Sequence, residues 1–174
     1  MHAVVVYESM YGNTHTIAEC LGDGLRSAFD TTVVPVSEAT ADLVEDAQLL
    51  VVGGPTHVHS LSRATTRKAA IDAARSKALQ VDASAAGLGL RDWLPALRPR
   101  DHAHPATAVA FDTRVRRPVS MTGRAARGIT QRLRRSGYRD IRDAGSFFVD
   151  KDNELLPGEA ERAVAWARAF ADSL

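Results

Sequence analysis

The residues best suited to chemistry form one short polar run near the amino terminus, Ser9-Met10-Tyr11-Gly12-Asn13-Thr14. The run follows an apolar segment at residues 3–6 and precedes a helical pattern that starts at Ile17, so it connects a strand to a helix. Its hydroxyl and amide side chains offer hydrogen-bond donors, and Gly12 permits close approach of a ligand to the backbone. The helix that follows directs its free N–H groups and its positive dipole end into the same loop. These residues therefore predict a phosphate site that needs no Lys or Arg.

Two other phosphate-binding patterns do not fit this run. A Walker loop ends in Gly-Lys-Ser/Thr, and the run contains no Lys. A dinucleotide fingerprint needs three spaced glycines, and the run has only Gly12. The simpler alternative is an ordinary strand-to-helix loop in which Thr14 caps the helix and no ligand binds.

Length and composition are those of a globular protein. We expect residues 1–174 to form a single domain, because 45% are hydrophobic and 25% are charged. No apolar run approaches the roughly 20 residues of a membrane span, and the first residues lack the pattern of a signal peptide. The single cysteine, Cys20, can form no internal disulfide. These features together predict a cytoplasmic protein without a membrane span.

The charges are segregated along the chain. Residues 113–142 contain ten arginines and one acidic residue, a local charge of +9, so the remainder carries −8. A segregated charge of this size favours one kind of partner. Nucleic acid is one alternative, but the arginines come with no recognition motif and no stacking aromatics. A solvated basic helix face is therefore the favoured interpretation, and we expect no nucleic-acid partner.

Hydrophobic periodicity predicts strands that alternate with helices. The expected strands lie at residues 3–6, 31–36, 48–52, 107–111 and 138–149, the last divided around Gly145. The expected helices lie at residues 14–28, 41–46, 67–77, 123–136 and from 157 onward. Such alternation is typical of a parallel sheet with right-handed crossovers and helices on both faces. Residues 80–105 are irregular apart from a short amphipathic piece at 90–97, and we interpret them as an insertion that packs onto the body.

Two further loops would lie beside the first at the ligand-binding edge. Ligands of open α/β sheets bind at the carboxyl ends of the strands, where the strand order reverses. The loop at residues 53–62 opens with Gly-Gly-Pro-Thr, whose small residues let backbone groups approach a ligand. Residues 112–122, after the next strand, are expected to form a loop, and the stretch at 111–118 where it begins is rich in arginine.

These loops resemble those of the flavodoxin family. The first resembles the family's FMN-phosphate loop, a Ser/Thr-x-x-Gly-x-Thr run directly after the first strand. The second resembles the loop along the isoalloxazine edge, and the third matches in position the loop over the other face of the flavin. The resemblance implies an α/β, flavodoxin-like, three-layer, doubly wound fold with a five-stranded parallel sheet in the order 2-1-3-4-5.

The resemblance also implies a set of residues that bind FMN. Ser9, Asn13 and Thr14 would hold the phosphate, together with backbone amides of Met10, Tyr11, Gly12 and Asn13. Pro55, Thr56 and His57 would border the ring. Asp112, Thr113 and Arg114 would approach its outer side. No catalytic residue is assigned.

Two departures from the family shape the expected function. The second and third loops lack the aromatic residues that usually stack on the flavin, and the chain lacks the strong acidity of electron-carrying flavodoxins. The first hypothesis is an FMN-binding redox protein that transfers electrons through the flavin. The second is an FMN-dependent NAD(P)H:quinone-type reductase, and the third is a binding module without flavin. The expected partner is a redox protein or NAD(P)H, and the sequence leaves open whether the protein is an enzyme.

Two histidine pairs are weak candidates for metal ligands. His57 and His59 form one His-x-His pattern, and His102 and His104 form another. Neither has a nearby Cys or carboxylate that would complete a recognisable site. We therefore expect no metal.

Overall fold

The computed structural model describes residues 1–56, 60–77, 80–97 and 106–174. Its strands form one parallel sheet with the order β2-β1-β3-β4-β5, as the sequence predicts. The strands are β1 (His2–Tyr7), β2 (Asp30–Pro35), β3 (Leu49–Pro55), β4 (Thr107–Val115) and β5 (Asp140–Val149).

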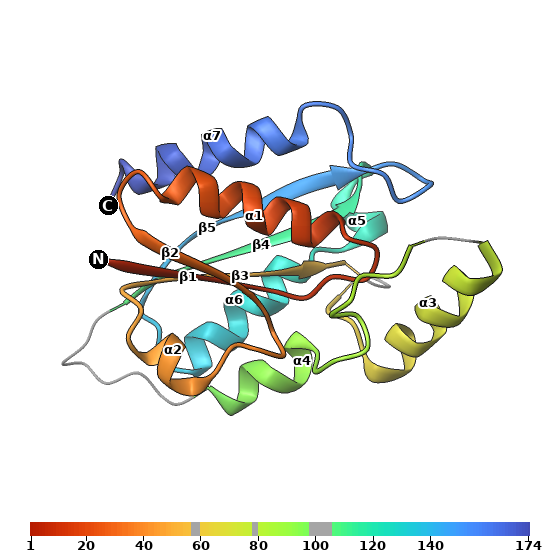
Figure 1. Ribbon diagram of the computed structural model, residues 1–174, viewed down its shortest axis with the longest axis horizontal. Helices are drawn as coiled ribbons and strands as arrows, with labels where there is room; N and C mark the ends of the chain where they lie inside the picture. The colour runs from red at the N-terminus through yellow and green to blue at the C-terminus, as the bar shows by residue number, and fades with distance from the viewer. Residues whose placement is uncertain (57–59, 78–79, 98–105) are drawn as a thin grey trace.

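Helices cover both faces of this sheet and make three layers (Figure 1). One face is covered by α1 (Asn13–Leu25) and α7 (Glu159–Ala171). The other face is covered by α2 (Ala41–Glu45), α4 (Leu90–Trp93) and α6 (Ala125–Arg135). The short 3-10 helix η1 (Leu94–Ala96) continues α4, and α5 (Val119–Thr122) follows β4. In contrast, α3 (Ala64–Lys77) projects beyond the carboxyl end of the sheet.

The interior strand β1 shows why a strand of this composition is buried on both sides. Ala3 and Val5 in β1 face the core beneath α1 and α7, whereas Val4 and Val6 face the core beneath the other helices. All four side chains are completely buried. A nearly continuous apolar run is what a parallel strand between two helical layers requires.

β3 and β4 extend several residues beyond the carboxyl ends that the sequence predicts for them. β3 continues to Pro55 and β4 to Val115, because Pro55 pairs with Thr113 and Val115 pairs with Val149. The expected loop at 112–122 is therefore wrong in its first part, since Asp112 to Arg114 lie in a strand. Its later part contains the short helix α5, which the sequence did not predict.

The last strand also differs from its prediction. β5 runs without a break from Asp140 to Val149 rather than in two pieces. The pairing of the two strands is nevertheless irregular just before Gly145. Val109 of β4 pairs with Arg142 and Phe111 pairs with Gly145, so two residues along β4 correspond to three residues along β5. One additional β5 residue is accommodated there as a bulge.

The described part of the chain contains no helix that is long and apolar enough to cross a membrane.

Helices α1 and α7 approach closely at Gly24. A Cβ atom at this position would lie 2.5 Å from the backbone oxygen of Val164 and 2.7 Å from the Cβ of Ala167. Backbone atoms cannot move aside as the end of a flexible side chain can. The contact between the two helices therefore requires glycine here.

We predict that Gly24→Ala lowers the free energy of unfolding by about 1–3 kcal/mol, because the added methyl group overpacks this contact. The matched control is Gly128→Ala in α6, where the nearest contact of a Cβ is the flexible guanidinium of Arg132 at 3.3 Å. Alanine is the better helix former, so the control should be neutral or stabilising by up to about 1 kcal/mol. Urea unfolding of both variants tests this, and equal effects would contradict the packing explanation.

Candidate functional site

A cavity of about 120 Å³ lies at the carboxyl ends of the strands, where the three loops meet. Eight of the twelve residues predicted for the site line it: Met10, Tyr11, Asn13, Thr14, Pro55, Thr56, Thr113 and Arg114. Val115, Val149 and Asn153 complete the described lining. The fold thus brings residues from distant parts of the sequence to one place.

The polar run forms a tight turn that leads into α1. Gly12 precedes the helix with a φ of 89°, a left-handed conformation that disfavours any side chain. Its N–H group donates to the hydroxyl of Ser9 at 3.2 Å, so this completely buried serine shapes the turn from within. Thr14 lies inside the first turn of α1, and the helix cap is Gly12. The alternative in which Thr14 is the cap is therefore wrong.

The first turn of α1 presents free donors. The regular helical hydrogen bonding begins with Thr16, whose N–H group donates to the carbonyl of Gly12 at 2.9 Å. Among the described residues, no acceptor is found for the backbone N–H groups of Asn13, Thr14 and His15. These groups, with the helix dipole behind them, suit an anion.

A pair of hydroxyl groups joins this helix to β4. The Oγ1 atoms of Thr14 and Thr113 lie 2.7 Å apart, and both residues are buried. Each hydroxyl has one proton, and their mutual hydrogen bond uses only one of the two. The second proton remains available to a ligand in the cavity.

Thr56 is held firmly at the edge expected for the ring. Its N–H group donates to the carbonyl of Thr113 at 2.9 Å, and its hydroxyl accepts from the N–H group of Ala125 at 3.0 Å. The residue therefore connects β3, β4 and the start of α6. Its neighbour His57 lies outside the described residues, so its predicted role stays a prediction.

The structure directs Asp112 away from the cavity. Its side chain is completely buried, and its two carboxylate oxygens accept from the hydroxyl of Ser146 at 2.6 Å and the N–H group of Ala126 at 3.0 Å. Successive side chains of a strand point to opposite faces, so Asp112 and the cavity-lining Thr113 point to opposite faces. Asp112 thus fixes the start of α6 and the middle of β5.

Arg114 lines the cavity and also shapes the loop that follows β4. Its Nη1 atom donates to the carbonyl of Arg117 at 2.8 Å and to the hydroxyl of Thr122 at 3.2 Å. Its guanidinium lies over the ring of Phe148, 4.9 Å from the centroid. Burial lowers the pKa of Arg114, Asp112 raises it, and Arg124 lowers it again, with a net lowering. Its Nε atom is buried and has no acceptor among the described residues.

Sequence reasoning missed Asn153, which closes the cavity from the loop after β5. Its backbone oxygen accepts a hydrogen bond from the side-chain amide of Asn13. Asn153 has a φ of 64°, the left-handed conformation that asparagine tolerates better than most residues. The sequence 150–153, Asp-Lys-Asp-Asn, is a turn signal that could have drawn attention to it.

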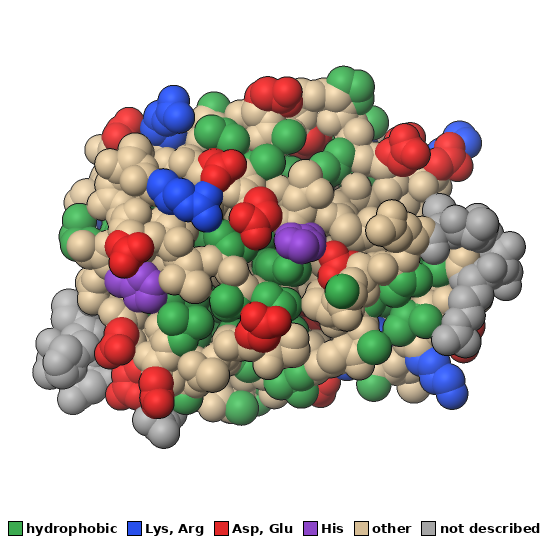
Figure 2. All heavy atoms as spheres, in the orientation of Figure 1, with side chains coloured by type: hydrophobic (Ala, Val, Ile, Leu, Met, Phe, Trp, Pro, Cys, Tyr) green, Lys and Arg blue, Asp and Glu red, His purple; other side chains and the backbone are tan. Residues whose placement is uncertain are grey.

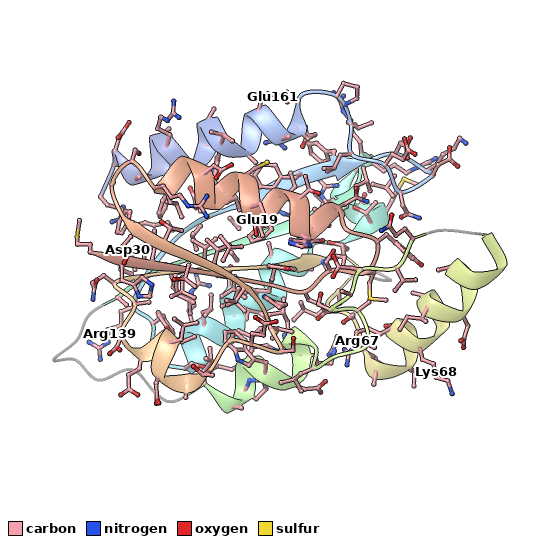
Figure 3. The ribbon with its side chains drawn as sticks, in the orientation of Figure 1. Glu19, Asp30, Arg67, Lys68, Arg139 and Glu161 are labelled. Atoms are coloured by element: carbon pink, nitrogen blue, oxygen red, sulfur yellow. The ribbon has the colours of Figure 1, made fainter. Side chains whose placement is uncertain are left out.

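Sequence reasoning also missed the buried carboxylate that ties the first two loops together. Glu8 is 3% exposed; one of its oxygens accepts from the hydroxyl of Ser62 and the other from the N–H group of Leu90 at 2.8 Å. Arg67 of α3 donates to the same Ser62 hydroxyl at 3.2 Å and lies 3.6 Å from the carboxylate of Asp92. Figure 3 shows Arg67 where α3 approaches α4.

The segment 80–88 braces the polar run from outside. The N–H group of Asp82 donates to the carbonyl of Met10 at 2.9 Å, and its carboxylate lies 3.2 Å from the Nδ1 atom of His15. The His15 ring stacks on Tyr7 at 4.6 Å. The Tyr11 hydroxyl donates to the carbonyl of Ala70 in α3 at 3.1 Å. The part of the chain between β3 and β4 thus supports the loop proposed to hold phosphate.

We predict that this brace is sensitive to acid. Burial alone would raise the pKa of Asp82, but hydrogen bonds from Ser84 and the nearby His15 outweigh it and hold the pKa below its usual value. A carboxyl group whose pKa is lower in the folded than in the unfolded protein stabilises the fold at pH values above its pKa in the unfolded protein. This contribution disappears as the pH falls through its pKa in the folded protein. Asp82→Asn should therefore cost about 1 kcal/mol at neutral pH, and the difference from wild type should vanish below the folded pKa.

Urea unfolding across a pH series tests this prediction. The control is Asp23→Asn, since Asp23 is 62% exposed in its pair with Arg26 and should contribute little. A difference between wild type and Asp82→Asn that persists unchanged into strong acid would contradict the assignment.

The composition of the cavity fits a phosphate monoester joined to an apolar ring system. Its described lining residues offer hydroxyl, amide and N–H donors and one guanidinium, and none of them is acidic. Met10, Pro55, Val115 and Val149 provide apolar surface, and Tyr11 is the aromatic member of this lining. No stacking aromatic comes from the described parts of the second or third loop.

A metal site finds no support in the described chain, where no three His, Cys, Asp or Glu side chains gather. The four histidines of the His-x-His patterns lie outside the described residues.

Comparison with known proteins gives a consistent picture. The sequence matches the flavodoxin family profile over residues 5–95. The fold is similar to an oxidised flavodoxin 1 from Bacillus cereus, with 13% identity and a TM-score of 0.66 over 100% of this chain and 99% of the other. It is also similar to a flavodoxin from Streptococcus pneumoniae TIGR4, with 16% identity and a TM-score of 0.65 over 100% of both chains.

A third similar structure is a flavodoxin from the domain Archaea, with 18% identity and a TM-score of 0.63 over 99% of this chain and 98% of the other. At these identities the likeness concerns the fold. No curated protein sequence matches this chain.

Proposed function

The chain belongs to the flavodoxin family, and from this premise we propose that it binds FMN and transfers electrons through it. The observation that carries the proposal is the cradle of unpaired donors at the start of α1. There the free N–H groups of Asn13 and Thr14 meet the hydroxyl pair of Thr14 and Thr113. This cradle suits the dianionic phosphate of a mononucleotide.

The chain's own residues would bind and orient the cofactor. The first turn of α1 and the Thr14–Thr113 pair would hold the phosphate, and Pro55 and Thr56 would border the ring. Asn153 would close the side of the cavity that the loop after β5 provides. FMN, when bound, supplies the capacity to accept and donate electrons.

The surroundings would favour reduction of the bound group. Arg114 lines the cavity, and its described lining has no carboxylate. A positive charge near a flavin stabilises added electrons, so we infer a reduction potential higher than acidic surroundings would give. A reductase that takes electrons from NAD(P)H would use the same site. Oxidation of NAD(P)H in the presence of an added quinone distinguishes that activity from electron carriage.

We predict that FMN binds at least tenfold more tightly than riboflavin and more tightly than FAD. A single hydrogen bond to a charged group contributes about 1.5–3 kcal/mol, and about 1.4 kcal/mol is tenfold in affinity. FAD lacks a terminal phosphate at the position that the cradle encloses. Isothermal titration calorimetry with the three ligands tests this, and equal affinity for FMN and riboflavin would remove the phosphate argument.

We also predict that Thr14→Val weakens FMN binding about 10- to 100-fold and leaves riboflavin binding nearly unchanged. Thr16→Val is the matched control, because Thr16 is exposed and, among the described residues, its hydroxyl donates only to the carbonyl of Gly12 at 3.1 Å. Urea unfolding of both variants separates loss of the ligand contact from loss of the fold. Normal FMN affinity in a folded Thr14→Val protein would show that the hydroxyl pair is only structural.

A further inference from the structure

Residues 116–121, between β4 and α5, form a continuous exposed surface that we call the 116–121 patch. All six residues are exposed, and the patch includes Arg116 and Arg117. It also includes Val119, which is 47% exposed, and Met121, which is 58% exposed. Exposed apolar side chains beside unpaired charges are typical of a surface that binds another protein.

Hydrogen bonds order the backbone of the patch. The N–H group of Arg117 donates to the carbonyl of Val115 at 2.8 Å, and that of Met121 donates to the carbonyl of Pro118 at 2.9 Å. The guanidinium of the partly buried Arg114 donates a hydrogen bond to the carbonyl of Arg117. The exposed side chains therefore stand on an ordered turn, which reduces the entropy lost when a partner binds.

The patch adjoins the candidate flavin cavity. Arg114 and Val115 line the cavity, and the next residue along the chain is Arg116. Figure 1 shows α5 at the carboxyl end of the sheet, the edge at which the three loops meet. A protein seated on the patch would therefore bring its own redox centre close to that edge.

The positive charge of the patch is not neutralised. Arg116, Arg117 and the exposed Arg127 of α6 form no ion pair with a described acidic residue. The neighbouring loop after β5 carries charge of the other sign: the N–H group of Arg116 donates to the carbonyl of Val149 at 3.3 Å, and Asp150, Asp152 and Glu154 follow Val149 in the chain. There Asp150 accepts from the N–H groups of Asp152 and Glu154, and Lys151 pairs with Asp152.

The rest of the surface adds to this separation of positive and negative charge. Figure 2 shows acidic side chains spread over the face that carries β2 and α1, with few Lys or Arg among them. Glu19 of α1 and Glu161 of α7 belong to the acidic part, as Figure 3 shows. A negatively charged partner would be repelled there and attracted to the arginine side of the cavity.

We propose that the 116–121 patch is the docking surface for an acidic redox protein. The proposal rests on the proposed FMN-dependent electron transfer and adds the chemical class of the partner. Arg116 and Arg117 would attract and orient the partner's carboxylates, and Val119 and Met121 would lose water on contact. The small size of the patch suits a weak, rapidly dissociating complex, as electron transfer requires.

The test uses an acidic plant-type ferredoxin as probe and basic cytochrome c as the opposite-charge control. Heteronuclear NMR titration of the protein, without and with FMN, reports where each probe binds. The salt series runs from about 20 to 300 mM, because screening shortens the range of exposed charges. We expect the largest ferredoxin-induced shifts in residues 114–124 and weaker binding as salt rises.

Three double variants separate the contributions. Arg116→Ser with Arg117→Ser should weaken ferredoxin binding about three- to tenfold at low salt and flatten its salt dependence. Arg134→Ser with Arg135→Ser removes the same charge from exposed positions at the far end of α6 and should change the affinity less than about twofold. Val119→Ser with Met121→Ser should weaken binding at every salt concentration.

Several results would overturn the proposal. These are no ferredoxin binding at low salt, shifts that map elsewhere, equal effects of the two arginine pairs, or equal binding of cytochrome c at the patch. Concentration-dependent shifts of the patch without any probe would identify a self-association surface instead. FMN affinity measured in parallel should be the same in all three variants. Because ferredoxin binding is also measured without FMN, a failure of the FMN proposal is distinguishable from a failure of the docking proposal.

Discussion

The hydrogen bonds of the buried Glu8 carboxylate are the constraint on which the site depends. Glu8 directly follows β1, and its two oxygens bind the Ser62 hydroxyl and the Leu90 N–H group, from segments that lie far along the chain. A carboxylate removed from water must have its hydrogen bonds satisfied, so the first loop, the second loop and α4 can pack together in only a few ways. The polar run starts at the next residue, so the hydrogen bonds of Glu8 set the position of the run.

Asp112 performs the same task within β4, where it joins β5 to the start of α6. Both carboxylates are buried and turned into the protein, whereas the described cavity lining carries hydroxyls, amides and a guanidinium. Acidic groups thus position the loops, and neutral or positive donors face the cavity. This separation suits an anionic ligand, because a carboxylate in the cavity would repel phosphate.

The loop after β4 connects the cavity to the surface. Arg114 lines the cavity, lies over Phe148 and bonds the backbone of the exposed turn at Arg117. A single side chain therefore fixes both the wall of the candidate flavin site and the surface next to it. The arginines that give residues 113–142 their charge serve different purposes, since Arg114 is partly buried and structural whereas Arg116 and Arg117 are exposed.

The sequence by itself determined the alternation of strands and helices, because apolar periodicity acts over short distances. The order of the strands followed from the resemblance to the flavodoxin family, and the structure confirms it. The phosphate-binding role of the first loop stays a prediction. Only the tertiary structure decided where each strand ends, since β3 and β4 extend as far as their neighbours offer hydrogen bonds. That extension places Thr113 in the cavity and Asp112 on the opposite face. Contacts between distant segments, such as those of Glu8 and Asn153, have no local signal of their partners and could be known only from the folded chain.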